Sequence, residues 1–273
     1  MSTGLVAQAL DNVAALRAGG GPGAWRIERA ALADRLAELV VEPDRVRQGR
    51  LNLCGPAALF AAWLHRDPAA VVRFASELFE HGRARIGDLP VSASRGLREY
   101  PYGRTERGRS CPSADWMLMA AVRDSTNRVL PYSRPGGLRE PPAAITMPGA
   151  LLRWLAATGC YRDLRDETTL VWRQGLDHAR ALRPDRGTDL FVLLAQEMFF
   201  PQLAWPRRVR NRVISLVPNH WVLLRSPVTV EADEVQFAFW SWGTVQRATV
   251  DRREFRRCYR GALKTLAAPG GRA

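Results

Sequence analysis

The order of the predicted elements along the chain indicates an α+β fold, in which helices precede a mostly antiparallel sheet. Apolar residues recur at helical spacing in the first part of the 273-residue chain. After Gly187 they gather instead in short runs rich in Val, Phe and Trp, which are typical of strands. Hydrophobic residues make up 47% of the chain, as expected for a globular protein with a substantial core.

The first part of the chain, residues 1–45, is predicted to be helical, with a glycine-rich break at residues 19–23. Apolar residues recur at helical spacing between Leu32 and Val40. This part forms either a separate N-terminal arm for docking or the first helices of the main domain. We expect the main domain to span residues 46–273.

The segment from Cys54 to Leu64 is apolar on every side, which predicts a helix buried in the centre of the fold. Pro56 suits the first turn of such a helix, because its missing N–H costs nothing there. Further helices are predicted at residues 68–81, from residue 113 onward and at residues 149–157. The intervening residues 83–111 and 127–147 are rich in Pro, Gly and Arg and are predicted to be surface loops.

The last third of the chain contains four predicted strands, at residues 189–195, 220–225, 235–242 and 245–250. Turn sequences at Ser226-Pro227 and Gly243-Thr244 separate the last three of them. Strands joined by short turns pair antiparallel, so we expect a mostly antiparallel sheet.

The net charge of +13 attracts polyanions, but its distribution disfavours nucleic acid as the main partner. Lys264 is the only lysine among the 40 basic residues, and the arginines are spread along the whole chain. The sequence also contains no RNP-like motif and no zinc-finger spacing. We therefore do not expect nucleic-acid binding to be the main function.

The sequence predicts neither a membrane span nor a Sec signal peptide. No apolar run approaches the ~18 residues that a span needs, and the amino terminus lacks a basic start followed by an apolar stretch. The four cysteines are far apart and form no CxxC pair, which argues against a zinc site and a disulfide scaffold. We expect synthesis in the cytoplasm, with no metal and no cofactor.

Cys54 is the strongest candidate for a catalytic residue. A thiol attacks only as the thiolate, and the unsatisfied N–H groups and the dipole at a helix start favour negative charge. Cys54 stands at the predicted start of the buried helix, and Gly55 leaves room for a substrate. The alternative is an inert buried cysteine, and two other residues favour the catalytic interpretation.

Gln48 and His220 are those two residues. Gln48 lies six positions before Cys54 in a loop, where its amide can join the Cys54 backbone N–H in holding an oxyanion. His220 begins an apolar strand late in the chain and can serve as the base. A cysteine on an early helix and a histidine on a late strand can face each other across a cleft, which predicts nucleophilic catalysis.

This arrangement resembles the papain-like cysteine peptidases. The shared features are a glutamine six residues before a Cys-Gly, a late Asn-His that begins an apolar strand, and a following Ser-Trp-Gly. The resemblance implies a papain-like fold. It also implies that Gln48 forms the oxyanion hole, Cys54 is the nucleophile and His220 is the base.

The residue that orients the histidine departs from the family pattern. The family has an asparagine in that role, but Trp240 stands in its place, and an indole can only donate a hydrogen bond. Ser241 has an acceptor oxygen, although strand alternation sends it to the other face from Trp240 unless a bulge intervenes. We choose Ser241 for this role, with a backbone carbonyl or Asp233 as alternatives.

Longer stretches, among them CGPAALF, ADWMLMAAVRDSTN and PNHWVLL, resemble bacterial papain-like toxin domains that type VI secretion delivers into competing cells. This resemblance implies an interbacterial effector that cleaves a target-cell protein. It also implies a cognate immunity protein and a contact with the secretion machinery.

Two alternatives to a protease remain open. The same cysteine and histidine can serve a deamidase, a transglutaminase or a peptidoglycan amidase, because one thioester mechanism serves them all. An inactive papain-like domain that binds a partner is the second alternative, and Trp240 in place of the asparagine favours it.

The remaining cysteines and histidines are expected to have structural roles. Packing roles are assigned to Cys111, Cys160 and Cys258, and surface or capping roles to His65, His81 and His178. Asp115 is expected to cap the helix that follows Pro112-Ser113, with a contact to the active site as the alternative.

Overall fold

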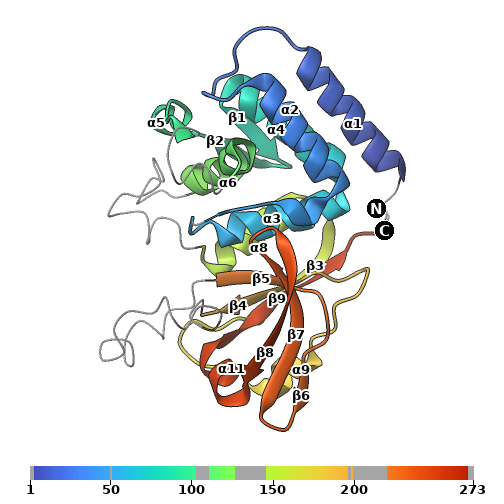
Figure 1. Ribbon diagram of the computed structural model, residues 1–273, viewed down its shortest axis with the longest axis vertical. Helices are drawn as coiled ribbons and strands as arrows, with labels where there is room; N and C mark the ends of the chain where they lie inside the picture. Colours follow the sequence, from blue (N-terminus) through green and yellow to red (C-terminus); the bar gives the residue numbers. More distant parts are fainter. Residues whose placement is uncertain are drawn as a thin grey trace. The chain divides into compact units, whose positions relative to one another are not determined.

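The computed structural model describes residues 3–49, 51–102, 111–126, 146–195, 198 and 220–269. The chain divides into two compact units, Met1–Cys160 with Ala268–Ala273, and Tyr161–Ala267. The first unit is mainly helical and the second is built on an antiparallel sheet, which confirms the α+β class (Figure 1). In the described part of the chain, every helix is too short or too polar to cross a membrane.

The first unit contains α1 (Thr3–Ala18), α2 (Arg29–Val41), the 3-10 helix η1 (Pro43–Arg45), α3 (Cys54–Arg66), α4 (Pro68–His81), α5 (Arg95–Arg98), α6 (Ser113–Thr126) and α8 (Pro148–Ala157). Helix α1 packs against α2 and α4 (Figure 1). The first two helices thus belong to this unit, and the boundary between the units lies at Cys160–Tyr161.

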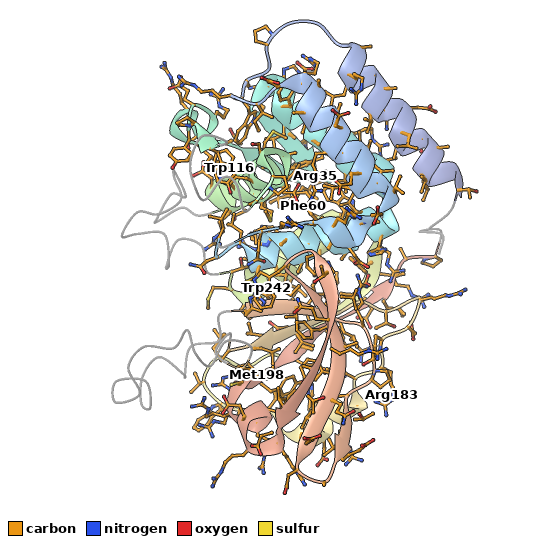
Figure 2. The ribbon with its side chains drawn as sticks, viewed as in Figure 1. Arg35, Phe60, Trp116, Arg183, Met198 and Trp242 are labelled. Atoms are coloured by element: carbon orange, nitrogen blue, oxygen red, sulfur yellow. The ribbon has the colours of Figure 1, made fainter. Side chains whose placement is uncertain are left out.

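Helix α3 is the centre of the first unit. Every residue of α3 except His65 is buried, as its uniformly apolar sequence predicts. Helices α4, α6 and α8 pack against it, and the ring of Phe60 lies 5.8 Å from that of Phe74 on α4 (Figure 2). Burial of one such aromatic side chain contributes about 1.5–3 kcal/mol, so α3 is held firmly from several sides.

The predicted loop at residues 83–111 is wrong in its first half. Strands β1 (Arg83–Ile86) and β2 (Leu89–Ser92) form an antiparallel hairpin there, and α5 follows. Only alternate residues of β1 are buried, so it is a short amphipathic strand whose exposed arginines resemble the sequence of a loop. Residues 103–110 lie outside the described residues. So do residues 127–145, which make up most of the second predicted loop.

The second unit contains β3 (Tyr161–Asp166), α9 (Leu176–Ala181), β4 (Leu190–Leu194), β5 (His220–Leu224), β6 (Thr229–Glu231), β7 (Glu234–Ser241), β8 (Thr244–Asp251), α11 (Arg252–Cys258) and β9 (Tyr259–Ala267). Its described strands form one seven-stranded sheet in the order β3-β9-β4-β5-β7-β6, and β8 pairs with β7. The pairings are all antiparallel. The four predicted strands are confirmed, while β3, β6 and β9 were not foreseen.

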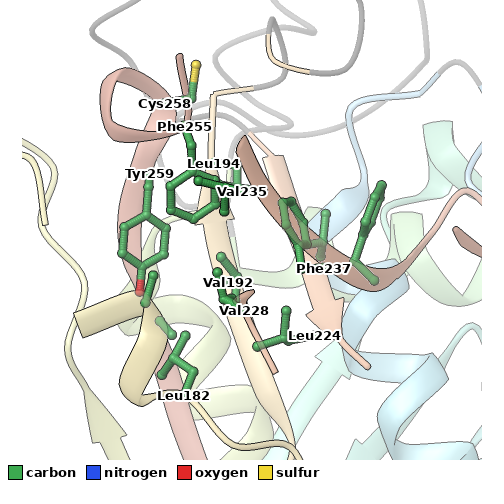
Figure 3. Close-up of a cluster of buried hydrophobic side chains, with 14 of the residues drawn as sticks. Leu182, Val192, Leu194, Leu224, Val228, Val235, Phe237, Phe255, Cys258 and Tyr259 are labelled. Carbon is green, nitrogen blue, oxygen red and sulfur yellow. The ribbon is translucent and has the colours of Figure 1, made fainter. Parts of the chain in front are cut away.

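One face of this sheet carries the core of the second unit. The buried side chains come from β4, β5, β7 and β9 and from helices α9 and α11 (Figure 3). Val222 and Leu224 on β5 alternate with Trp221 and Leu223, so β5 presents apolar side chains to both faces. This burial on both sides fixes the position of β5, and His220 is its first residue.

Candidate active site

Cys54 is the first residue of α3, as the sequence predicts. Leu53 precedes it and has no side-chain oxygen that could cap the helix. The N–H groups of the first turn therefore point toward the region of the thiol, where they favour negative charge. The Cys54 side chain itself is almost fully buried, because the residue is only 4% exposed.

Gly55 does not leave the open space that the sequence analysis assigned to a substrate. A Cβ atom at this position would lie 2.4 Å from the Cβ of Thr146. The side chain of Thr146 therefore occupies this space, and the glycine is needed for close packing beside the thiol.

Arg123, on α6, supplies a positive charge near Cys54 that was not predicted from the sequence. The residue is buried, and burial lowers the pKa of Arg123 to about 10, while attraction to the Cys54 sulfur opposes that fall. The guanidinium stays protonated at neutral pH and favours the thiolate form of a nearby cysteine. An arginine inside the otherwise apolar MLMAAVR stretch was the signal available in the sequence.

Gln48 lies in the loop that leads into α3, and its side chain is buried. Its Nε2 donates to the carbonyl of Leu51 at 3.0 Å, and the Leu51 N–H donates back to the Gln48 carbonyl at 3.2 Å. Gly49 between them has φ +59°, a conformation that glycine adopts readily. This small closed turn fixes the Gln48 amide and uses one of its two N–H groups.

A buried ion pair anchors the same loop. Asp115 on α6 accepts hydrogen bonds from Arg35 Nε and Nη2, both at 2.8 Å, and from the backbone N–H of Arg47 at 2.7 Å. Arg35 also donates to the Arg45 carbonyl at 2.6 Å. We had expected Asp115 to cap its own helix. Instead, it ties α2 and α6 to Arg47, the residue before Gln48.

Burial and pairing act in opposite directions on this ion pair. Burial raises the pKa of Asp115, and the hydrogen bonds and charge of Arg35 oppose the rise. Burial also disfavours the charged form of Arg35, but Asp115 raises its pKa above the ordinary value. The bidentate geometry favours the ionised pair.

His220 and Ser241 meet within the second unit. His220 Nε2 lies 2.9 Å from Ser241 Oγ, and both residues are buried. The β5–β7 register pairs Leu223 with Trp240, and its extension places Val222 opposite Ser241. His220 and Val222 lie on the same face, so Ser241 is the diagonal neighbour of His220. No bulge is needed, because His220 itself lies on the opposite face from Trp240.

Trp242 covers the imidazole of His220. The two rings are stacked, with centroids 4.4 Å apart and an interplanar angle of 14°. Trp242 and Gly243 form a two-residue turn between β7 and β8, with φ +52° and +84°. A positive φ is unfavourable for a bulky residue, so the turn holds Trp242 in a strained conformation over the histidine.

His220 is neutral at ordinary pH, because burial lowers its pKa to about 3. A neutral imidazole has one N–H donor and one acceptor nitrogen. With Nε2 directed at Ser241, Nδ1 is the nitrogen that a substrate or nucleophile would use.

Asp233 is too far from His220 to orient it. It lies in the turn between β6 and β7, whereas Ser241 is at the other end of the eight-residue strand β7. Eight residues of antiparallel strand span roughly 25 Å. Of the two side chains considered for this role, only Ser241 is in contact with the imidazole.

Two histidines have more partners than surface positions would give them. His178 lies 2.6 Å from the Tyr259 hydroxyl and 2.8 Å from Glu167, and His65 lies 2.9 Å from Asp44.

All four cysteines lie in the described part of the chain, and none forms a disulfide.

Comparisons with protein-family models, with curated proteins and with solved structures found no match. Among the residues that the structure describes, no cluster of three or more His, Cys, Asp or Glu is suited to a metal ion. Of the four predicted site residues, Gln48 and Cys54 thus lie in the first unit, and His220 and Ser241 are in contact in the second.

Proposed function

We propose that this protein is a cysteine-dependent hydrolase in which Cys54 is the nucleophile and His220 is the general base. The observation that carries the proposal is the state of His220. It is neutral, hydrogen-bonded through Nε2 to Ser241 and covered by Trp242. The hydrogen bond to Ser241 and the cover of Trp242 fix the orientation of the imidazole, and its neutral form has an acceptor nitrogen with which to take a proton.

The environment of Cys54 supports the same chemistry from the other unit. The thiol lies at an uncapped helix start and near the buried Arg123. Both features stabilise a thiolate. An inert structural cysteine would need neither of them.

The reaction follows from these roles. The Cys54 thiol gives its proton to His220 Nδ1, and the sulfur attacks the carbonyl carbon of the substrate. The Gln48 amide and the Cys54 N–H hold the oxyanion. The C–N bond then breaks, and His220 returns the proton to the leaving amine. Water, activated by His220, hydrolyses the thioester and regenerates the thiol.

An internal peptide bond of a protein in a target bacterial cell is our first choice of substrate. This choice, like delivery by type VI secretion and the existence of an immunity protein, comes from the sequence resemblance to papain-like toxin domains. The catalytic roles of Cys54, His220, Gln48 and Ser241 also rest on the local chemistry described above.

The test is a comparison of target cells that express the wild-type chain or its Cys54→Ala variant, with Cys160→Ala as a matched control for loss of a buried thiol. New protein termini in the wild-type and Cys160→Ala cells alone would support a protease. Conversion of glutamine to glutamate would indicate a deamidase, and altered muropeptides an amidase. Toxicity that persists in a folded Cys54→Ala protein would contradict the proposal.

A further inference from the structure

The second unit carries an exposed surface that the proposed chemistry does not use. A pocket of about 450 Å³ is lined by Arg173, Gln174, Gly175, Asp233, Asp251, Arg252, Arg253 and Arg256. These residues come from the segment before α9, the β6–β7 turn and the start of α11, which lie at one end of the sheet (Figure 1). We define this pocket, together with Val171 and Trp172, as the Arg–Trp surface.

The pocket is positively charged. Four arginines face two aspartates, and within the described part of the chain none of the four pairs with a carboxylate. Asp251 is already engaged, because its Oδ1 accepts from the N–H groups of Arg253 at 2.8 Å and Glu254 at 3.1 Å. Burial lowers the pKa of Arg260, and repulsion from Arg173 lowers it further.

Beside this pocket lie the two most exposed large apolar side chains of the described residues. Val171 is 76% exposed and Trp172 is 77% exposed, and they directly precede Arg173. Exposed tryptophan next to arginine is the composition of protein-binding hot spots rather than of ordinary protein surface.

The segment that presents Trp172 is fixed to the sheet. The N–H groups of Glu167 and Thr169 donate to carbonyls of β9 at 3.0 and 2.8 Å, and the Trp172 N–H donates to Thr169 Oγ1 at 3.0 Å. At Gly261 a Cβ atom would lie 2.2 Å from the Glu167 carbonyl oxygen, so this segment packs directly on β9. A fixed segment loses little entropy on binding.

We infer that the Arg–Trp surface binds an acidic segment of a protein partner, in which apolar side chains alternate with Asp or Glu. The apolar side chains would cover Val171 and Trp172, and the carboxylates would pair with the arginines of the pocket. One observation favours a peptide over nucleic acid. Val171 is as exposed as Trp172, and an aliphatic side chain offers an apolar contact to a peptide but no ring on which a base could stack.

Binding of a synthetic probe tests this inference. The full-length chain is titrated with a short fluorescent peptide that alternates Glu or Asp with Leu or Phe. The same peptide with Gln and Asn in place of the acids is the uncharged control, and a dT oligonucleotide is the nucleic-acid control. We expect micromolar binding of the acidic peptide, weaker at higher salt, and at least tenfold weaker binding of the other two.

Matched variants show whether binding occurs at this surface. Trp172→Ala and the double variant Arg253→Glu/Arg256→Glu should each weaken binding about tenfold or more. Val245→Ala and Arg162→Glu, at exposed positions of the same unit outside the pocket, are the apolar and charged controls and should leave binding unchanged. Thermal unfolding checks that each variant is folded.

Three results would overturn the inference: no binding of the acidic peptide, equal loss in the control variants, or tighter binding of the oligonucleotide. None of them bears on Cys54, so the proposed hydrolase activity is tested separately.

Discussion

Replacement of Asp115 by alanine is expected to destabilise the protein and to weaken catalysis through the Gln48 loop. The Asp115 carboxylate is fully buried and accepts three hydrogen bonds, two from Arg35 and one from the Arg47 N–H. Its removal leaves the Arg35 charge in a largely buried position without its main partner. Breaking a buried ion pair in this way costs about 3–5 kcal/mol, a large part of a typical total stability of about 5–15 kcal/mol.

Urea unfolding measures this loss, and two variants serve as controls. Glu99→Ala removes an exposed ion pair with Arg95 of the same 2.8 Å length and should leave stability nearly unchanged, because solvent screens exposed pairs. The double variant Arg35→Leu/Asp115→Leu removes both charges and should cost less than Asp115→Ala alone. A loss for Asp115→Ala as small as that for Glu99→Ala would refute the reasoning.

The catalytic part of the prediction is measured on the folded protein. If Asp115 positions the Gln48 loop, kcat should fall in Asp115→Ala while KM changes little, because the oxyanion contact acts mainly in the transition state. An unchanged kcat would mean that the ion pair stabilises the fold without positioning Gln48.

Three further outcomes are expected. Gln48→Ala should lower kcat by ~10²-fold without unfolding, since it removes one oxyanion donor, and an unchanged rate would make Gln48 a loop residue only. Ser241→Ala should lower the rate about tenfold, or about 1.4 kcal/mol, while Asp233→Asn changes little. The reverse pattern would contradict the assignment of Ser241. Burial holds the pKa of His220 near 3, so as the pH falls below ~6.5 the unfolded chain binds a proton that the folded chain does not. As the pH falls from ~6 to ~3, this group alone should therefore lower the free energy of unfolding by about 1.4 kcal/mol per pH unit. The His220→Gln variant should lack that contribution, and equal slopes for the two proteins would contradict it.

The helices near the candidate site could be predicted because their signals are local. The uniformly apolar stretch after Cys54 predicted the buried helix α3, and the helix predicted at residues 68–81 is α4, which Asp67 and Gly82 cap. Asp67 accepts from the Ala70 N–H at 2.9 Å, and Gly82 ends the helix with φ +68°. Caps of this kind are encoded within a few residues, so sequence reasoning finds them.

The contacts that hold the site depend on residues far apart in the sequence. Arg35 and Asp115 are 80 positions apart, and neither local sequence indicates that the two residues form a pair. Strand alternation places Ser241 and Trp240 on opposite faces of the sheet, but only the register between β5 and β7 shows that Ser241 shares its face with His220. Likewise, four of the six residues of β3 are charged, and its pairing with β9 is what makes it a strand.

The most direct test of the proposed nucleophile is the alkylation rate of the four cysteines, measured by mass spectrometry after a short iodoacetamide pulse near pH 7. If exposure alone set the rate, Cys160, at 8% exposed, would react before Cys54, at 4%. Burial raises the pKa of Cys111, so that thiol should stay unreactive. Because an uncapped helix start and Arg123 favour the thiolate, we expect Cys54 to react first, well below the ordinary thiol pKa of ~8.5. In the His220→Ala variant this reaction should slow. Faster labelling of Cys160 than of Cys54, or labelling of Cys54 that does not depend on His220, would contradict the Cys54–His220 pair.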